Sequence, residues 1–459
     1  MSTKQQQLDY MERYLVYDIF KYFGRDVALL SHSIECSNGL DGFMSALYTI
    51  QLDLRMPSGS DKSELVLVKF MKGSKEFRES SKSYTQCANE IFLYAKLLPA
   101  FENLLRSSRL NTELAAQFVP RSYWATYGTV EALGDGRESV LALQHLRPGG
   151  YELGPRLALR QDQLEAMSVQ LGQFHALGYA MRIVQPQLHE RLQSELIPLP
   201  FVVADNSANL YAVLYRVAFD RFYEFYDRCG KQLIQTASSS SEEEDARFAD
   251  AVQRLRTKYF EQPIDLLEHI RSTSGESHFS TFLHGDFNRN NVLFHEDDEG
   301  RVDNIKMIDF QEMRYSTVAI DISFYLYMNI PAAERLQLFP KLLRLYHGQM
   351  LQLLELLLQR NRETLGEEQI EQLLTDYSYE QFEGHFKRYA FYGVMICMHF
   401  LPWLLGSEAD CDRLSKLFET DMHGAAFHQL SMEIAGDEAN RQIFNIMRHA
   451  FDQGYMDSI

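Results

Sequence analysis

Hydrophobic and polar positions follow two different periods in two parts of the chain. In the first 146 residues, runs in which apolar and polar residues alternate predict β-strands. The strands are expected near residues 27–36, 43–56, 64–71, 121–128 and 139–146. Two helices are expected among them, because apolar residues recur there at helical spacing. They are an amphipathic helix over residues 8–23 and an inserted helix that Cys87, Ile91, Tyr94 and Leu98 mark.

The segment Leu146–Gly150, which contains Pro148, interrupts this pattern, and from about residue 157 the apolar spacing is helical. Helices are expected over residues 157–180, 203–235, 246–270, 331–358, 366–376, 380–405, 408–420 and 435–454. The stretch Ser238–Asp245, four serines and then four acids, is expected to be a solvated loop. The pattern therefore predicts an α+β protein with a sheet-containing N-lobe, residues 1–146, and a large, mainly helical C-lobe, residues 147–459.

Candidate chemistry is concentrated between His284 and Gln311. The stretch begins His-Gly-Asp-Phe-Asn-Arg-Asn-Asn and ends Ile-Asp-Phe-Gln, so it contains Asp286, Asn291 and Asp309. Phosphoryl transfer needs a carboxylate near the acceptor hydroxyl and oxygen ligands that hold Mg²⁺ against the β- and γ-phosphates. Asp286 is the candidate for the first role, and Asn291 with Asp309 for the second. The alternative is a polar turn followed by a solvated hairpin.

Two apolar runs, residues 292–294 and 305–308, flank a charged turn, which predicts a β-hairpin. A loop before its first strand and a residue just after its second would bring Asp286, Asn291 and Asp309 to one end. The same mechanism needs a cation for the phosphates. Lys69 shares a strand face with Leu65 and Leu67, and Glu90 lies on or beside the apolar face of the inserted helix.

An ammonium and a carboxylate that both point inward are expected to pair, because burying either charge alone is costly. In kinases such a pair orients the lysine onto the α- and β-phosphates. The alternative is that Lys69 and Glu90 are two side chains whose charged ends reach solvent. Two further nucleotide contacts are expected. The turn with Asn38, Gly39 and Gly42 would lie over the phosphates, or be an ordinary hairpin. The hinge residues Gln144 and Leu146 would present backbone groups to adenine.

Composition narrows the class of partner. The net charge of −18 argues against nucleic acid and anionic membrane surfaces as partners. The five cysteines are scattered and lack metal-ligand spacing, and the first residues lack the apolar core of a secretory signal, so a cytoplasmic location with reduced thiols is expected. The apolar segment 389–406 is expected to be a buried helix rather than a membrane span, since His399 and Pro402 interrupt it. No obligate protein partner is evident.

Two residues outside the main motif are expected to be structural. Asp321 opens an apolar helix, where it would cap that helix or anchor the backbone of the catalytic loop, and we favour the second role. His175 adjoins the apolar face of the helix that ends near residue 180, and a core or supporting role is favoured over that of a ligand.

The motifs resemble those of the ecdysteroid kinase-like family, which is related to choline kinases and aminoglycoside phosphotransferases and shares the two-lobed protein-kinase-like fold. The resemblance covers roughly residues 30–420. The matching parts are Phe-Leu-His-Gly-Asp with Asn-Asn-Val-Leu-Phe, Ile-Asp-Phe-Gln, Ala-Ile-Asp at 319–321 and Leu-Gly-Gln-Phe-His-Ala at 171–176. The strand with Lys69 and the helix that begins near Asn89-Glu90 also match, and the resemblance is most specific over residues 281–325. Two departures are Gln144-His145, where the family usually has an acidic pair, and Asn288, where it usually has Trp.

The resemblance implies that Asp286 is the catalytic base and that Lys69, paired with Glu90, binds phosphates. It also implies that Asn291 and Asp309 hold Mg²⁺. The expected protein is an ATP- and Mg²⁺-dependent kinase that phosphorylates a hydroxyl of an ecdysteroid or a hydroxylated xenobiotic. Alternatives are a choline- or aminoglycoside-type kinase and a catalytically silent protein of the same fold that binds steroid-like ligands.

Overall fold

The computed structural model describes residues 2–36, 45–134, 136–204, 206, 209–236, 241–273 and 277–459. The chain folds into two compact units. Unit 1 comprises residues 1–153, 181–198 and 290–314, and unit 2 comprises residues 154–180, 199–289 and 315–459. The sequence predicts one division after residue 146. The first unit extends to Leu153 and includes two later segments. The hairpin within residues 290–314 pairs with the strand that ends at Leu153, and Ile197 of the other segment bonds with Asn89.

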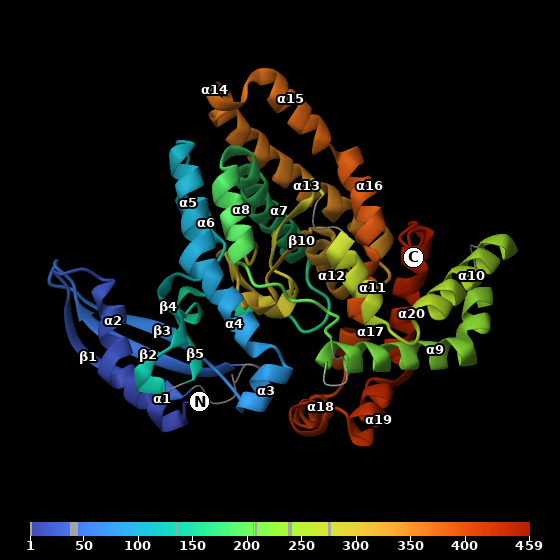
Figure 1. Ribbon diagram of the computed structural model, residues 1–459, viewed down its shortest axis with the longest axis horizontal. Helices are drawn as coiled ribbons and strands as arrows, with labels where there is room; N and C mark the ends of the chain where they lie inside the picture. The colour runs from blue at the N-terminus through green and yellow to red at the C-terminus, as the bar shows by residue number, and fades with distance from the viewer. Residues whose placement is uncertain are drawn as a thin grey trace. The chain divides into compact units, whose positions relative to one another are not determined.

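Unit 1 is built on an antiparallel sheet of five strands in the order β1-β2-β3-β5-β4 (Figure 1). Its strands are β1 (Ala28–Cys36), β2 (Ser45–Arg55), β3 (Asp61–Met71), β4 (Ser122–Thr129) and β5 (Arg137–Gln144), and a second small sheet has the order β6 (Glu152–Leu153), β8 (Val292–Glu296) and β9 (Val302–Met307). Its helices are α1 (Lys4–Tyr10), α2 (Val16–Lys21), α3 (Lys75–Ser80), α4 (Ser83–Phe92), α5 (Leu98–Ser107), α6 (Glu113–Gln117) and α8 (Pro186–Glu195).

The core of unit 1 lies between the five-stranded sheet and the N-terminal helices. Met11 and Leu15, in a π-helical stretch between α1 and α2, pack with Ile50 of β2 and with Val66 and Val68 of β3. All five side chains are fully buried. The amphipathic N-terminal helix and the five strands expected from the sequence are therefore confirmed, with strand ends that differ by a few residues.

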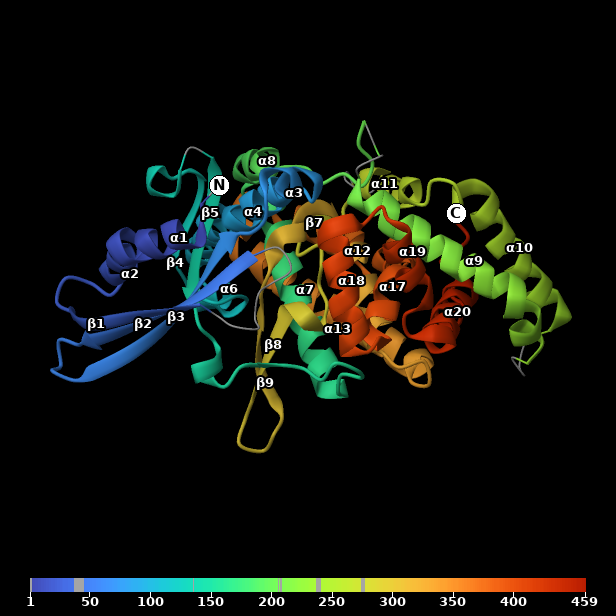
Figure 2. The same cartoon turned by 90° about the horizontal axis from the view of Figure 1, so that it is seen from below.

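Unit 2 is mainly helical, with one two-stranded sheet of β7 (Ser280–Leu283) and β10 (Arg314–Thr317) (Figure 2). Its helices are α7 (Gln161–Val184, whose last residues belong to unit 1), α9 (Leu210–Thr236), α10 (Glu242–Tyr259), α11 (Ile264–Thr273), α12 (Ala319–Asn329), α13 (Arg335–Arg360), α14 (Arg362–Leu365), α15 (Glu367–Asp376), α16 (Tyr379–Tyr389), α17 (Phe391–Leu405), α18 (Glu408–Asp421), α19 (Ala425–Glu433) and α20 (Gly436–Asp452).

Helix α17 is the centre of unit 2, where it packs against α9, α12 and α20. Most of its side chains are buried, from Phe391 to Pro402. The expectation of a buried helix in the apolar segment 389–406 is confirmed. None of the helices in the described part of the chain combines the length and apolar character that crossing a bilayer requires. The α+β class, with a small antiparallel sheet followed by a large helical part, is confirmed as well.

One expected loop is partly wrong. The acids of the stretch Ser238–Asp245 do not form a loop, because α10 begins at Glu242. The Ser241 hydroxyl accepts a hydrogen bond from the Glu244 N–H, and the Glu244 carboxylate accepts one from the Ser241 N–H. This capping box satisfies two free donors at the helix start, and acids in a first turn interact favourably with the helix dipole. Residues 237–240 lie outside the described residues.

Candidate active site

Unit 1 brings Lys69 of β3 and Glu90 of α4 into contact. The Lys69 ammonium donates hydrogen bonds to both carboxylate oxygens of Glu90, each at 2.8 Å. Only 13% of the Lys69 side chain and 4% of the Glu90 side chain are exposed. Lys69 lies on the half-buried face of β3, with Leu65 and Leu67, while Val66 alternates onto the fully buried face. The pairing expected from the sequence is present, and the alternative of two solvated side chains is wrong.

The same ammonium also contacts Asp309, which is the second residue after the hairpin strand β9. Lys69 Nζ lies 3.1 Å from Asp309 Oδ1, and 41% of the Asp309 side chain is exposed. Asp309 has a φ of 63°, a left-handed conformation that non-glycine residues adopt rarely and at an energetic cost. Such strain is concentrated at functional sites, so the backbone supports a special role for Asp309.

The two acids set the protonation state of Lys69. Burial by itself would lower the pKa of the Lys69 ammonium, but the nearby Asp309 and Glu90 carboxylates raise it above its ordinary value. Burial raises the pKa of the Glu90 carboxyl, and the attraction of Lys69 opposes this rise. The Phe310 N–H also donates to the Glu90 carboxylate. Lys69 is therefore a permanently charged ammonium in a fixed position.

Asn89, next to Glu90, fixes helix α4 within unit 1. Its side-chain amide donates to the carbonyls of Ile197, at 2.8 Å, and Met313, at 3.2 Å. Its oxygen accepts from the Ile197 N–H at 3.1 Å. These three bonds connect α4 to segments that are more than 100 residues away in the sequence. Sequence reasoning used Asn89 only as part of the family resemblance, although a polar residue on a buried helix face was an available signal.

Asn291 and Asp309 lie at the same end of the hairpin of β8 and β9. Val292 pairs with Met307, and the Ile308 N–H donates to the Asn291 carbonyl at 2.9 Å, so Asn291 lies opposite the residue before Asp309. The hairpin expected from the sequence is confirmed. A carboxylate and an amide oxygen are the hard oxygen ligands that Mg²⁺ prefers, and the half-exposed Asp309 is accessible to an ion. These two residues therefore fit a magnesium ion whose other ligands are water and phosphate. No cluster of three or more His, Cys, Asp or Glu ligands occurs among the described residues.

Asp286 belongs to unit 2, in the loop after β7. Two backbone N–H groups of this loop, those of His284 and Gly285, donate to the two carboxylate oxygens of Asp321, each at 2.8 Å. Asp321 is fully buried at the start of α12. It anchors the loop backbone, which confirms the role favoured from the sequence. A buried carboxylate with two backbone donors holds the loop in one conformation.

His175 supports Asp321 from helix α7. Its Nε2 lies 3.3 Å from Asp321 Oδ2, and its Nδ1 lies 2.8 Å from the Tyr346 hydroxyl. Burial lowers the pKa of His175, although Asp321 acts in the opposite direction, so the imidazole is neutral at pH 7. The supporting role expected for His175 is thus confirmed.

Asn288 contacts the Asp286 side chain directly, which sequence reasoning did not predict. Its amide donates to Asp286 Oδ1 at 2.9 Å and to the Asp286 carbonyl at 3.2 Å. Only 7% of Asn288 is exposed. The sequence showed only that Asn replaces the usual Trp at this position. Asn side chains commonly hydrogen-bond neighbouring backbone groups in turns, and that local tendency was the available signal.

The hinge contains a backbone donor, the Leu146 N–H, that no group among the described residues accepts. The Gln144 N–H donates to the Arg121 carbonyl at 2.8 Å, and the Leu146 carbonyl accepts from the Gly149 N–H at 2.9 Å. Among the described residues, the Leu146 N–H finds no hydrogen-bond acceptor. This N–H is free to donate a hydrogen bond to a nitrogen of an adenine ring.

The site residues expected from the sequence fall into three groups: those in unit 1, the one in unit 2, and those outside the described residues. Lys69, Glu90, Asn291 and Asp309 lie in unit 1, with the hinge residues Gln144 and Leu146. Asp286 lies in unit 2, so its convergence with the other residues stays a prediction. Asn38, Gly39 and Gly42 lie outside the described residues, and their contact with phosphates also stays a prediction.

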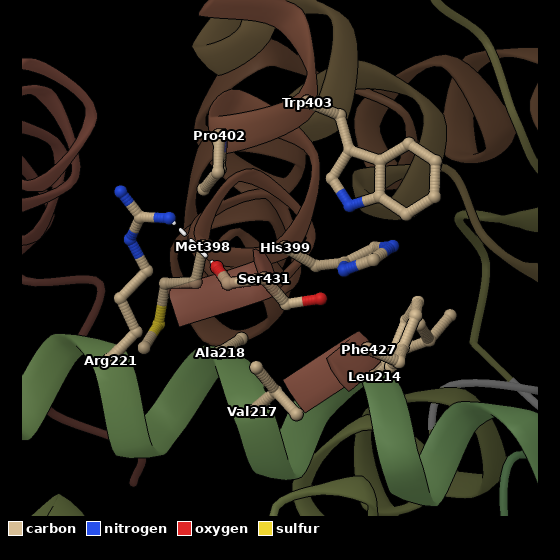
Figure 3. Close-up of a pocket in the computed structure, with 10 residues that line it drawn as sticks. All are labelled: Leu214, Val217, Ala218, Arg221, Met398, His399, Pro402, Trp403, Phe427 and Ser431. Atoms are coloured by element: carbon tan, nitrogen blue, oxygen red, sulfur yellow. Dashed lines mark hydrogen bonds between the residues drawn. The ribbon is translucent and has the colours of Figure 1, made fainter. Parts of the chain in front are cut away.

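Unit 2 contains an apolar hollow where α9, α17 and α19 meet (Figure 3). Its walls are mostly apolar and aromatic, and include Leu214, Met398, Trp403 and Phe427. A half-open hollow of about 460 Å³ adjoins it and shares Phe427 as a wall residue. Pockets for small molecules have volumes of about 300–1,000 Å³ and mostly apolar walls, so the larger hollow has a suitable size.

Similarity to known proteins extends to a protein family and to a solved structure. No curated protein sequence matches the chain. A solved structure that resembles it is the apoenzyme of macrolide 2'-phosphotransferase MphH from Brachybacterium faecium, with 12% identity, a TM-score of 0.29, and coverage of 79% of this chain and 97% of that chain. The model of the ecdysteroid kinase-like family matches residues 39–359, which is well over half of the sequence, and this match confirms the resemblance drawn from the motifs. The chain therefore belongs to the ecdysteroid kinase-like family and is a phosphotransferase that acts on an alcohol group of a small molecule.

Proposed function

We propose that this protein transfers the γ-phosphoryl group of ATP to a hydroxyl of a steroid-like acceptor, such as an ecdysteroid, or of a hydroxylated xenobiotic. The observation that carries the proposal is the position of Lys69, whose ammonium lies between Glu90 and Asp309. A β3 lysine paired with a helix glutamate is the arrangement that protein kinases use to hold the α- and β-phosphates.

Each candidate site residue of the first unit has a defined role in this proposal. Lys69 binds the α- and β-phosphates, and Glu90 keeps its ammonium in position. Gln144 and Leu146 present backbone groups to adenine, while Asn38, Gly39 and Gly42 are assigned to the phosphates on sequence grounds alone. Asn291 and Asp309 are the residues that would hold Mg²⁺, which supplies charge neutralisation at the β- and γ-phosphates when bound.

Asp286 is assigned the role of catalytic base. It accepts the proton of the acceptor hydroxyl and orients that hydroxyl toward the phosphorus atom. The anchoring of its loop to Asp321 supports this role, because general base catalysis depends on a carboxylate in a fixed position. Asn288 limits the rotation of the Asp286 side chain in the same way.

The acceptor is assigned from the family and from the mostly apolar walls of the smaller hollow in unit 2; the larger hollow beside it has mixed walls, with Arg216 and Glu261 as well as apolar side chains. Apolar and aromatic side chains suit a steroid-like molecule or an apolar xenobiotic. Besides the polar His399 and Ser431, the smaller hollow is lined by the cationic side chain of Arg221, and a cation there disfavours a quaternary ammonium or an aminoglycoside. A choline- or aminoglycoside-type activity is therefore the less favoured alternative.

Two measurements test the proposal. The first is the melting temperature with and without Mg·ATP for the wild type, Asp309→Ala and Asp303→Ala. A ligand at a hundredfold over its dissociation constant stabilises a protein by about 2.7 kcal/mol. We expect the wild type and Asp303→Ala to be stabilised, since Asp303 is an exposed residue of the same hairpin that pairs with His295. Asp309→Ala should lose most of the effect, and an equal shift in all three proteins would remove Asp309 from the metal site.

The second measurement is ATP consumption, with mass detection of the phosphorylated product, across sterols, plant glycosides and amino alcohols. Asp286→Asn should lower kcat by about 10²–10⁴-fold while Mg·ATP still stabilises the variant. Wild-type turnover by Asp286→Asn would exclude Asp286 as the base. Stabilisation by Mg·ATP without any product across the whole panel would favour the silent binding protein.

A further inference from the structure

Two arginines of unit 2, Arg156 and Arg289, lie close together and both donate only to uncharged groups. Arg289 Nη1 donates to the carbonyls of Pro155, at 3.0 Å, and Gly154, at 3.5 Å. These carbonyls immediately precede Arg156 in the chain. Arg156 Nη2 in turn donates to the carbonyls of Gly406, at 2.8 Å, and Trp403, at 3.2 Å, and to Cys411 Sγ at 3.5 Å.

Neither guanidinium has a carboxylate within 4.0 Å among the described residues. This is notable in a chain with 63 acidic and 45 basic residues. Arg289 is half-buried and Arg156 is exposed, whereas the buried Arg78 pairs with Glu138 and the half-buried Arg448 pairs with Asp245. Two adjacent like charges with no acid beside them repel each other, with the larger effect on the half-buried Arg289, and a bound anion would offset that repulsion.

The side chain of Arg289 also has an unused donor. Its Nε is shielded from solvent and has no hydrogen-bond partner in the described part of the chain. Arg221, a buried arginine that likewise lacks a direct acid partner, differs because all three of its nitrogens are bonded. They donate to Asn440 Oδ1, to the Gly436 carbonyl and to the Ser431 carbonyl, and Figure 3 shows the last of these bonds. A shielded N–H without a partner is costly, so Arg289 is incomplete where Arg221 is satisfied.

The positive charges of Arg289 and Arg156 also favour a bound anion. Burial and the neighbouring Arg156 lower the pKa of Arg289 to about 10, so it remains protonated at pH 7. An oxyanion would accept hydrogen bonds from both guanidinium groups and remove the repulsion between them. Arginine is suited to this task because its planar fork binds phosphate, sulfate and carboxylate groups in a bidentate way.

The position of the pair connects it with the reaction. Arg289 lies three residues after Asp286 in the same loop. Arg156 contacts the carbonyl of Trp403, whose side chain lines the apolar hollow (Figure 3). The two arginines thus link the loop of the assigned base to a wall of that hollow.

We propose that Arg156 and Arg289 form an oxyanion-binding site of unit 2 that takes an anionic group of a reactant. That group is either the phosphoryl group in transfer or an acidic substituent, such as a sulfate, phosphate or carboxylate, on the acceptor. The assignment to a reactant rests on the proposed function, whereas the existence of the oxyanion site does not.

The test uses the full-length protein and inorganic sulfate as the probe. Sulfate stabilises proteins in general by exclusion from their surface, so the informative quantity is the saturable part of the rise in melting temperature. The wild type and the control Arg413→Gln, which changes an exposed arginine of unit 2 that pairs with Asp410, should show the same saturable rise. Arg289→Gln and Arg156→Gln should raise the sulfate dissociation constant on the order of tenfold or more.

Both arginines also hold backbone carbonyls, so loss of either could destabilise the fold. A purely structural role would lower the melting temperature by the same amount at every sulfate concentration. Arg289→Lys, which keeps the charge but not the fork, gives a second variant if Arg289→Gln does not fold, and it should bind sulfate with intermediate affinity. An equal saturable rise in all variants, or none in the wild type, would overturn the proposal.

A second arm identifies the source of the anion. Saturating Mg²⁺ with a non-hydrolysable ATP analogue should abolish the sulfate effect if the transferred phosphoryl group uses the site. The effect should persist if the site serves an acidic substituent of the acceptor, and sulfate should then inhibit turnover in competition with the acceptor. Failure of the proposed function would appear separately, as the absence of Mg·ATP stabilisation in a protein that still binds sulfate.

Discussion

Both carboxylate oxygens of Glu90 accept hydrogen bonds from the Lys69 ammonium, at 2.8 Å each. Because one ammonium bonds both oxygens, the side chains of Glu90 and Lys69 hold each other in position. Asp309 Oδ1 is a third acceptor of the same ammonium, at 3.1 Å. Because Glu90 is 4% exposed, this geometry is not exchanged with water in the way a surface pair would be. The Lys69–Glu90 pairing therefore places a permanent cation beside Asp309. The contribution of this pair to stability can be measured directly.

Glu90→Ala should weaken ATP binding and turnover together. The substitution leaves Lys69 buried with Asp309 as its remaining acidic partner, and removal of one member of a buried pair costs about 3–5 kcal/mol when no other partner exists. We expect a smaller loss of unfolding free energy, of about 1–3 kcal/mol, measured by urea denaturation. Asp250→Ala, which breaks an exposed pair with Arg254, should cost at most about 0.5 kcal/mol. Equal losses in the two variants would show that the Lys69–Glu90 pair has no special energetic role.

Asn288→Ala should lower kcat more than it changes the KM for ATP. The amide of Asn288 donates to Asp286 Oδ1, and a hydrogen bond to a charged group contributes about 1.5–3 kcal/mol. Its loss corresponds to roughly 10–100-fold in kcat if Asp286 must be held in one rotamer for proton transfer. Asn304→Ala, on strand β9, serves as the control and should retain wild-type kinetics. A kcat within twofold of the wild type for Asn288→Ala would contradict the positioning role, since twofold is about 0.4 kcal/mol.

Gly393→Ala should destabilise unit 2 through a steric conflict between two helices. A methyl group on Gly393 of α17 would overlap the backbone carbonyl of Ser323 in α12, and backbone cannot move aside as a flexible side chain can. Overpacking of this kind costs about 1–3 kcal/mol. Gly348→Ala in α13 is the matched control, because nothing lies within 4 Å of its added methyl group. That variant should gain about 0.8–1.0 kcal/mol from helix propensity, so the two substitutions should have opposite signs in thermal melts.

Stability should fall as the pH is lowered from about 6.5 to 4, partly because of His449. Burial and Arg335 lower the pKa of His449 to about 4, whereas an unfolded histidine titrates near its ordinary value of about 6.5. In that window the unfolded state binds a proton that the folded state does not, so acid favours unfolding by up to about 1.4 kcal/mol per pH unit. His449→Gln should reduce the slope of unfolding free energy against pH by about that amount.

Tyr327→Phe provides the control for the pH measurement. Tyr327 places its hydroxyl 3.0 Å from His449 Nδ1, and its removal leaves the imidazole in place. This variant should therefore keep most of the wild-type slope. An unchanged slope in His449→Gln would contradict a titration of His449 between pH 4 and 6.5.

Local sequence patterns were sufficient for several parts of the site. The period-two pattern of β3 assigned Lys69 to the half-buried face, and the helical period assigned Glu90 to the inner side of α4, because both depend only on the geometry of one element. The hairpin that carries Asn291 and Asp309 followed from two apolar runs and a charged turn. The start of α10 was missed although its signal is local, since Ser241 and Glu244 form a capping box that the run of acids obscured.

What the sequence by itself determined about this protein is the order and type of most elements and the family, while the residues that it assigns to phosphoryl transfer stay a prediction. The tertiary structure alone decided which distant groups meet: Asn89 with Ile197, His175 with Tyr346, and Arg289 with Pro155. Periodicity reports which side of its own helix or strand a residue occupies, within a few residues of chain. Contacts over more than 30 residues depend on how elements pack and on which buried donors find acceptors, and no local pattern encodes that choice.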